Sequence, residues 1–120
     1  MKSVAEIEEI IINSTGTTAY HSISPIEGFP VLTDGCKAVA EAAECYWFFD
    51  IVGNYQIDTR LDPYFQVWTL MVDLEENTAV INGFNDRELI ITQEIPFTDF
   101  PMKKFTVWVE SNVILLPSEH

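Results

Sequence analysis

Two stretches of the N-terminal part of the chain repeat their apolar side chains at helical spacing. Ser3-Val4-Ala5-Glu6 has the form of a capping box, and apolar residues follow in positions 4, 7, 10 and 11. We therefore expect a first helix over about residues 3–13. A second, longer helix is expected over about residues 34–56, because Thr33 or Asp34 can cap its start.

One face of the second expected helix is apolar except for a single carboxylate. At helical spacing this face comprises Cys36, Ala40, Ala43, Trp47, Asp50, Ile51 and Asn54. Over residues 45–52 the helix is apolar nearly all round, so both of its sides must be covered. We expect Asp50 to be a buried polar anchor, hydrogen-bonded to Arg60, His21, a Tyr hydroxyl or loop amides, because an unpaired buried carboxylate is costly. An acid or base in a cleft is the alternative.

After Pro63 the apolar positions alternate, which predicts strands. The runs rich in β-branched and aromatic residues are 64–72, 78–82, 88–95, 105–110 and 113–116. Short polar turns separate them, and Ser111-Asn112 suits a tight two-residue hairpin. The loop 14–33 has room for a short extended piece. We predict one α+β domain over residues 1–120, with two helices packed on one face of a four- or five-stranded antiparallel meander sheet.

The charge of the chain limits the classes of partner. Nineteen acids against six bases give a formal net charge of -13, and the acids are spread along the whole chain. Such a field repels phosphate backbones, so we do not expect direct binding of nucleic acid. No stretch approaches the roughly 20 apolar residues that span a bilayer, and the N-terminal residues include acids where a signal peptide would have bases. We expect a cytoplasmic protein without a membrane partner.

Few residues have the spacing that catalysis or metal binding requires. No paired Cys or His ligands occur at helical or turn spacing, so we expect no metal and no cofactor. Cys36 and Cys45, on one expected helix, cannot form a disulfide with each other. A triad of Cys45, His21 and Asp50 assembled by the fold stays open as an alternative. We therefore regard an enzyme as the less favoured class, with a small hydrolase or ligand-binding domain near Asp50 as its form.

The excess of acids favours a protein partner with a basic surface. A domain of this size needs a net charge of only about 2 to 8 for solubility. The residues predicted to contact the partner are Glu41, Glu44, Asp73, Glu75, Glu76 and, for apolar contact area, Phe48. A basic nucleic-acid-binding protein fits this chemistry. A homodimer that covers the apolar side of residues 45–52 is a further possibility.

Four stretches together resemble a known family. They are TDGCKAVAEAAECYWFFD (33–50), FQVW (65–68), QEIPFTDFP (93–101) and LLPSE (115–119). Their order and spacing resemble an uncharacterised family, a domain of unknown function found as small acidic stand-alone proteins in bacterial, plasmid and phage genomes. The resemblance implies no activity. By analogy with small acidic proteins of mobile elements, it favours a nucleic-acid mimic that inhibits a host defence protein, similar in character to anti-CRISPR proteins.

Overall fold

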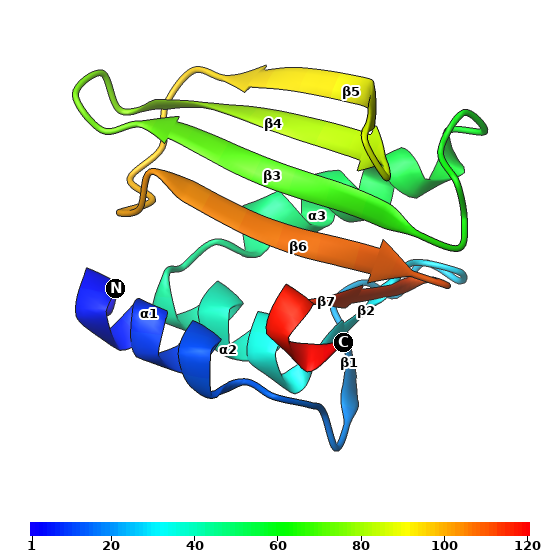
Figure 1. Ribbon diagram of the computed structural model, residues 1–120, viewed down its shortest axis with the longest axis horizontal. Coiled ribbons are helices and arrows are strands. Elements are labelled where there is room, and N and C mark those ends of the chain that lie inside the picture. Colours follow the sequence, from blue (N-terminus) through cyan, green and yellow to red (C-terminus); the bar gives the residue numbers. More distant parts are fainter.

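A single seven-stranded sheet organises the computed structural model, which describes residues 1–120 (Figure 1). In chain order the elements are α1 (Val4–Asn13), β1 (Tyr20–Ser22), β2 (Val31–Thr33), α2 (Asp34–Ala42), α3 (Tyr46–Asn54), the 3-10 helix η1 (Tyr55–Ile57), β3 (Gln66–Asp73), β4 (Thr78–Asn85), β5 (Glu88–Ile95), β6 (Lys104–Glu110), β7 (Val113–Leu115) and the 3-10 helix η2 (Pro117–Glu119). The strand order is β1-β2-β7-β6-β3-β4-β5. The α+β class is confirmed.

The alternating runs after Pro63 all form strands, but their arrangement differs from the predicted meander. β3, β4 and β5 follow one another as neighbours, and β6 and β7 form a hairpin, but β5 and β6 are not adjacent. Instead, β6 pairs with β3 on the side away from β4. β3 contains the buried residues Gln66, Trp68, Thr69 and Leu70. Because buried backbone groups must be hydrogen-bonded, such a strand needs a neighbour on each side. The pairing of β6 with β3 therefore follows from the burial of β3.

The β6–β7 connection has the geometry that its sequence predicts. Ser111 and Asn112 both have positive φ angles, of 46° and 70°. This is the backbone of a tight two-residue hairpin, whose twist matches that of the strands it joins. The expected hairpin is therefore present, with Trp108 opposite Leu115.

The N-terminal loop contributes two strands instead of one short extended piece. β1 pairs antiparallel with β2, and β2 pairs in parallel with β7, with Leu32 opposite Ile114. The sheet is therefore mixed and has seven strands, so the predicted four- or five-stranded antiparallel sheet is wrong in detail. Strands of three residues are too short for alternation to identify them.

The predicted second helix is two helices. α2 ends at Ala42, and Glu44 adopts a left-handed conformation with a φ of 51° before α3 begins at Tyr46. A residue in this conformation ends a helix because its carbonyl leaves the helical direction. α3 therefore starts in a new phase, and the apolar stripe predicted for one long helix does not continue through it.

The main core lies between α3 and one face of the sheet. In Figure 1 α3 lies behind β3 and β6, and α1 lies beside α2. The rings of Phe48 and Phe49 from α3 meet the ring of Phe105 from β6 at centroid distances of 5.7 and 6.3 Å. The predicted capping box of α1 is present between Ser3 and Glu6. Aromatic packing thus holds α3 against the sheet.

Candidate functional site

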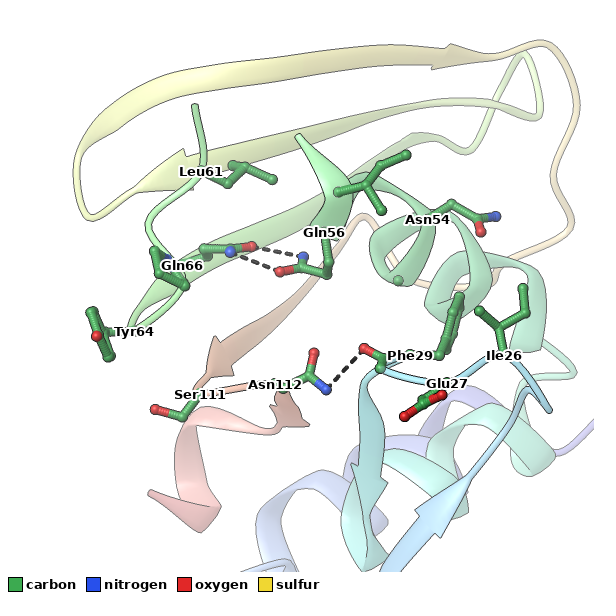
Figure 2. A pocket seen from close by; sticks show the side chains of 14 residues that line it. Ile26, Glu27, Phe29, Asn54, Gln56, Leu61, Tyr64, Gln66, Ser111 and Asn112 are labelled. Carbon is green, nitrogen blue, oxygen red and sulfur yellow. Dashed lines mark hydrogen bonds between the residues drawn. The ribbon is translucent and has the colours of Figure 1, made fainter. Parts of the chain in front are cut away.

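A cavity of about 560 Å³ opens at the end of the sheet where α3 finishes. Figure 2 shows its walls, which come from the β1–β2 loop, the end of α3, the segment before β3 and the β6–β7 turn. The lining residues are Ile26, Glu27, Gly28, Phe29, Gly53, Asn54, Gln56, Ile57, Leu61, Pro63, Tyr64, Gln66, Ser111 and Asn112. Its volume is within the usual range of small-molecule sites.

Two glutamine side chains form a fixed wall of this cavity. Gln56 Nε2 donates to Gln66 Oε1 at 2.9 Å, and Gln66 Nε2 donates back to Gln56 Oε1 at 2.8 Å. Gln66 is buried and also accepts from Trp68 Nε1 at 2.8 Å. Because the indole N–H needs an acceptor, this bond decides which end of the Gln66 amide is oxygen. The pair is therefore ordered without a ligand.

The opposite wall is built from a loop and a turn that are far apart in sequence. Asn112 Nδ2 donates to the carbonyl oxygen of Gly28 at 3.1 Å, which joins the β6–β7 turn to the β1–β2 loop. The ring of Phe29 lies against Gly53, where an added Cβ would be only 2.2 Å from the ring. In Figure 2 Phe29 and Asn112 face the two glutamines across the cavity. These contacts join the loop to the β6–β7 turn and pack it against the end of α3.

The mouth of the cavity is apolar and almost without charge. Ile57, Tyr64 and Ile26 are 89%, 76% and 63% exposed, and they gather around the same opening. Glu27 is the single charged residue in the lining, and no Lys, Arg or His lines it. The sequence interpretation missed this site. Its one local signal is the group of amide side chains that follows the apolar helix.

Asp50 and Phe48 do not have the environments predicted for them. Asp50 is exposed, so the prediction of a buried polar anchor is wrong. Phe48 is 0% exposed and belongs to the core, so it is not available for contact with a partner. Both differences follow from the break at Glu44, because α3 turns Phe48, Phe49 and the residues one turn later inward. Asp50 then lies on the outward side.

The alternative triad of Cys45, His21 and Asp50 is not present. His21 Nε2 lies 2.7 Å from Asp34 Oδ1, at the start of α2. Cys45 is buried, and its Sγ donates to the carbonyl of Val39 at 3.8 Å. Burial raises the pKa of the Cys45 thiol to about 12, so it is not a thiolate at neutral pH. The chain therefore holds no activated cysteine in the predicted arrangement.

Cys36 has the same character as Cys45. It is a buried free thiol, and desolvation raises its pKa far above the ordinary value. The two cysteines are free, although they do not lie on the one helix from which this was predicted. No group of three or more His, Cys, Asp or Glu side chains is arranged to hold a metal ion. None of the helices combines the length and apolar character needed to cross a membrane.

Asp34 organises the start of α2. It accepts hydrogen bonds from the backbone N–H of Thr18 at 2.9 Å and from the Thr18 hydroxyl at 3.0 Å, and it contacts His21. The Thr18 backbone bond, followed by the His21 contact, lowers the pKa of Asp34 well below its ordinary value. The carboxylate thus joins the loop before β1 and β1 itself to α2.

We expect the stability of the fold to depend on Asp34 at acidic pH. Since its pKa is lower in the folded chain than in the unfolded chain, its contribution is complete above the unfolded pKa of about 3.9 and is lost as the pH falls toward the folded value. Urea unfolding at about pH 5.5 and about pH 3 tests this. Asp34→Asn should reduce the difference between the two midpoints, whereas Asp86→Asn at an exposed turn should not. An unchanged difference in Asp34→Asn would contradict the assignment.

The predicted acidic residues come from two segments at one edge of the molecule, the α2–α3 junction and the β3–β4 junction. Glu41 lies at the end of α2 and Glu44 in its connection to α3, whereas Asp73 ends β3 and Glu75 and Glu76 lie in the β3–β4 turn (Figure 1). The β5–β6 loop joins these two places. Thr98 N–H donates to the carbonyl of Asn77 in the turn at 2.8 Å, while Asp99 lies close enough to Cys45 to raise its pKa. We call Glu41, Glu44, Asp73, Glu75 and Glu76 the acidic edge.

These features define a small α+β protein with an ordered cavity at one end of its sheet and an acidic edge at the other. The chain belongs to the family of unknown function DUF6876, whose model matches residues 5–120. This confirms the resemblance to an uncharacterised domain. No curated protein and no solved structure shows significant similarity to the chain.

Proposed function

We propose that this protein is a non-enzymatic binding protein whose acidic edge docks on a basic, nucleic-acid-binding surface of another protein. The observation that supports this most is that two acidic segments, the α2–α3 junction and the β3–β4 junction, lie at the same edge of the molecule although they are separated in sequence. The net charge of -13 also favours a partner with a basic surface. Opposite charge on a partner would accelerate association and make it sensitive to salt.

The acidic edge is ordered before any partner arrives. Asp73 Oδ1 accepts from the backbone N–H groups of Glu75 and Glu76 at 3.0 and 3.2 Å, so the β3–β4 turn has a defined shape. Glu75 and Glu76 are exposed. Two positive groups lie among these acids: Lys37 Nζ is 3.8 Å from Glu41 Oε1, and the N-terminal ammonium of Met1 contacts Glu44. The edge therefore presents a pattern of charges, which favours one register of docking over a uniform attraction.

The geometry favours binding over the hydrolase alternative. Asp50 does not line the cavity, His21 is held by Asp34, and Cys45 is buried. The groups named for that chemistry are therefore not within reach of one another. The narrower form of our proposal is a nucleic-acid mimic that inhibits a host defence protein in the manner of an anti-CRISPR protein.

A charge-neutral variant of the acidic edge tests the proposal. We expect Glu41→Gln/Glu44→Gln/Glu75→Gln/Glu76→Gln to lose binding to its partner by at least about tenfold at low salt, because steering and complementary charge are removed. The partner is identified by affinity capture from cell lysate and mass spectrometry. Its release by competing duplex DNA or RNA then measures whether the occupied surface is one that binds nucleic acid.

The matched control removes the same number of acids elsewhere. Glu8→Gln/Glu9→Gln/Asp86→Asn/Glu88→Gln changes the net charge equally but leaves the acidic edge intact. It should retain binding within about threefold. Equal losses in both variants would show that net charge alone acts. A captured partner that neither DNA nor RNA displaces would contradict the mimicry.

A further inference from the structure

The glutamine wall of the cavity, formed by Gln56 and Gln66, has no free hydrogen-bond donors but keeps a free acceptor. Both N–H groups of Gln56 are used, on Val52 O at 3.1 Å and on Gln66 Oε1 at 2.9 Å. Both N–H groups of Gln66 are also used, on Gln56 Oε1 and on the carbonyl of Asp62 at 2.9 Å. The side-chain donors of this wall are therefore fully occupied by the protein itself.

Acceptors in the same cavity keep unused capacity. Gln56 Oε1 accepts one hydrogen bond, from Gln66, although a carbonyl oxygen has two lone pairs. Asn112 uses one of its two amide N–H groups on Gly28 O and its Oδ1 accepts no hydrogen bond, and Figure 2 shows this amide facing the cavity. The carboxylate of Glu27 is a further acceptor in the lining. Unused amide donors remain on Asn54 and Asn112, but the glutamine wall offers a ligand acceptors only, and Glu27 adds the one charged acceptor.

Charge and apolar surface restrict the ligand further. Glu27 is the only charged residue of the lining, and the chain as a whole has a net charge of -13, so an anionic ligand would be repelled. Apolar contact is available from Phe29, Leu61 and the exposed Ile57. Hydroxyl groups of Ser111 and Tyr64 at the rim can accept as well as donate.

We infer that this cavity binds an organic cation, an ammonium, amidinium or guanidinium group on an apolar body. The cationic group donates to Gln56 Oε1, Asn112 Oδ1 and Glu27, while the body lies against Phe29 and its apolar neighbours. This inference goes beyond the proposed function, because the cavity and the acidic edge lie at opposite ends of β3 and α3. Such a cation is either a free small molecule or a Lys or Arg side chain of another protein.

A matched set of ring compounds tests the charge and hydrogen-bonding requirement. Benzamidine, benzamide and benzoate share one ring but are cationic, neutral and anionic. By calorimetric titration of the full chain, benzamidine should bind at least about tenfold more tightly than benzamide, and benzoate should not bind. Benzamide or benzoate binding as tightly as benzamidine would overturn the inference, as would a failure of benzamidine to bind.

Variants locate the binding. Glu27→Gln should weaken benzamidine by about fivefold or more, whereas Glu88→Gln, an equal charge change at an exposed position outside the lining, should stay within about twofold. Asn112→Gly removes the amide and keeps a residue suited to the positive φ of the turn, so it separates ligand binding from folding. It should also weaken benzamidine. Equal effects of Glu27→Gln and Glu88→Gln would overturn the site assignment.

Two further probes distinguish the sources of the cation. Agmatine represents a free small molecule, and a terminally blocked Gly-Arg-Gly peptide represents the side chain of a protein. Tighter binding of agmatine favours the small molecule, whereas equal or tighter binding of the peptide favours a protein side chain. If neither bound while the acidic-edge variant still lost its partner, the inference would fail and the proposed function would stand.

Discussion

Replacing Phe48 by Ala should lower the free energy of unfolding by about 3 to 5 kcal/mol, the range for buried aromatic residues. Phe48 is 0% exposed, and its ring lies 5.4 Å from that of Phe49 and 5.7 Å from that of Phe105. The substitution removes apolar contact area and leaves a space that neighbouring rings cannot fill completely. Urea unfolding followed by tryptophan fluorescence measures the change.

The exposed Phe97 provides the control for this prediction. Phe97 is 69% exposed, so Phe97→Ala removes the same atoms from a site that water already reaches. Its effect should be within about 0.5 kcal/mol, as for most surface substitutions. Similar losses for the two variants would contradict the placement of Phe48 at the centre of the α3–sheet core.

Gly83→Ala should be the second strongly destabilising substitution, with a cost of about 1 to 3 kcal/mol from overpacking. Gly83 on β4 lies directly opposite Trp68 on β3. A Cβ on Gly83 would be 2.7 Å from the nearest atom of the Trp68 ring. The ring cannot move aside easily, because it is buried and its Nε1 donates to Gln66. The unfolding midpoint in urea reports the effect.

Two further variants separate this clash from a general effect of removing glycine. Gly16→Ala, where no atom lies within 4 Å of the added Cβ, should be nearly neutral. In the Trp68→Phe background, the smaller ring should make Gly83→Ala less costly, which a double-mutant cycle measures as a coupling energy. Additive effects in that cycle would show that Trp68 is not the group that Gly83 accommodates.

The relation between the two proposed sites follows from the elements that build them. α3 and β3 both extend between the acidic edge and the cavity, in opposite chain directions. The packing of Phe48 against the sheet therefore supports both ends at once, and Trp68 joins the sheet core to the Gln56–Gln66 wall. A core variant that lost binding could have lost it by unfolding. The substitutions chosen for the binding tests therefore lie at exposed positions or at the rim of the cavity.

Local features of this chain were predictable from its sequence because they depend on neighbouring residues. The capping box at Ser3 and Glu6 satisfies groups within one helical turn, and the Ser111-Asn112 hairpin depends on the conformations of its own two residues. The five alternating runs after Pro63 likewise predict strands from their own side chains. Each of these elements requires no information about distant parts of the chain.

The break at Glu44 was not predictable in this way. No glycine or proline marks residues 43–46, and a left-handed glutamate is uncommon. The apolar character of the helix continues across the break, so periodicity gives no sign of the change in phase. Because of this one backbone conformation, Asp50 is exposed although it was predicted to be buried, and Phe48 lies in the core although it was predicted to contact a partner.

The sequence by itself thus determined the α+β class, the first helix, the C-terminal strands, their tight hairpin and the acidic character of the surface. The tertiary structure alone decided that β6 pairs with β3, that β2 joins β7 in parallel, and that a cavity forms around Gln56 and Gln66. The physical reason is the range of the interactions. Capping, alternation and turn conformation act over a few residues, whereas strand order and cavity walls depend on which buried surfaces and backbone groups find each other across the whole chain.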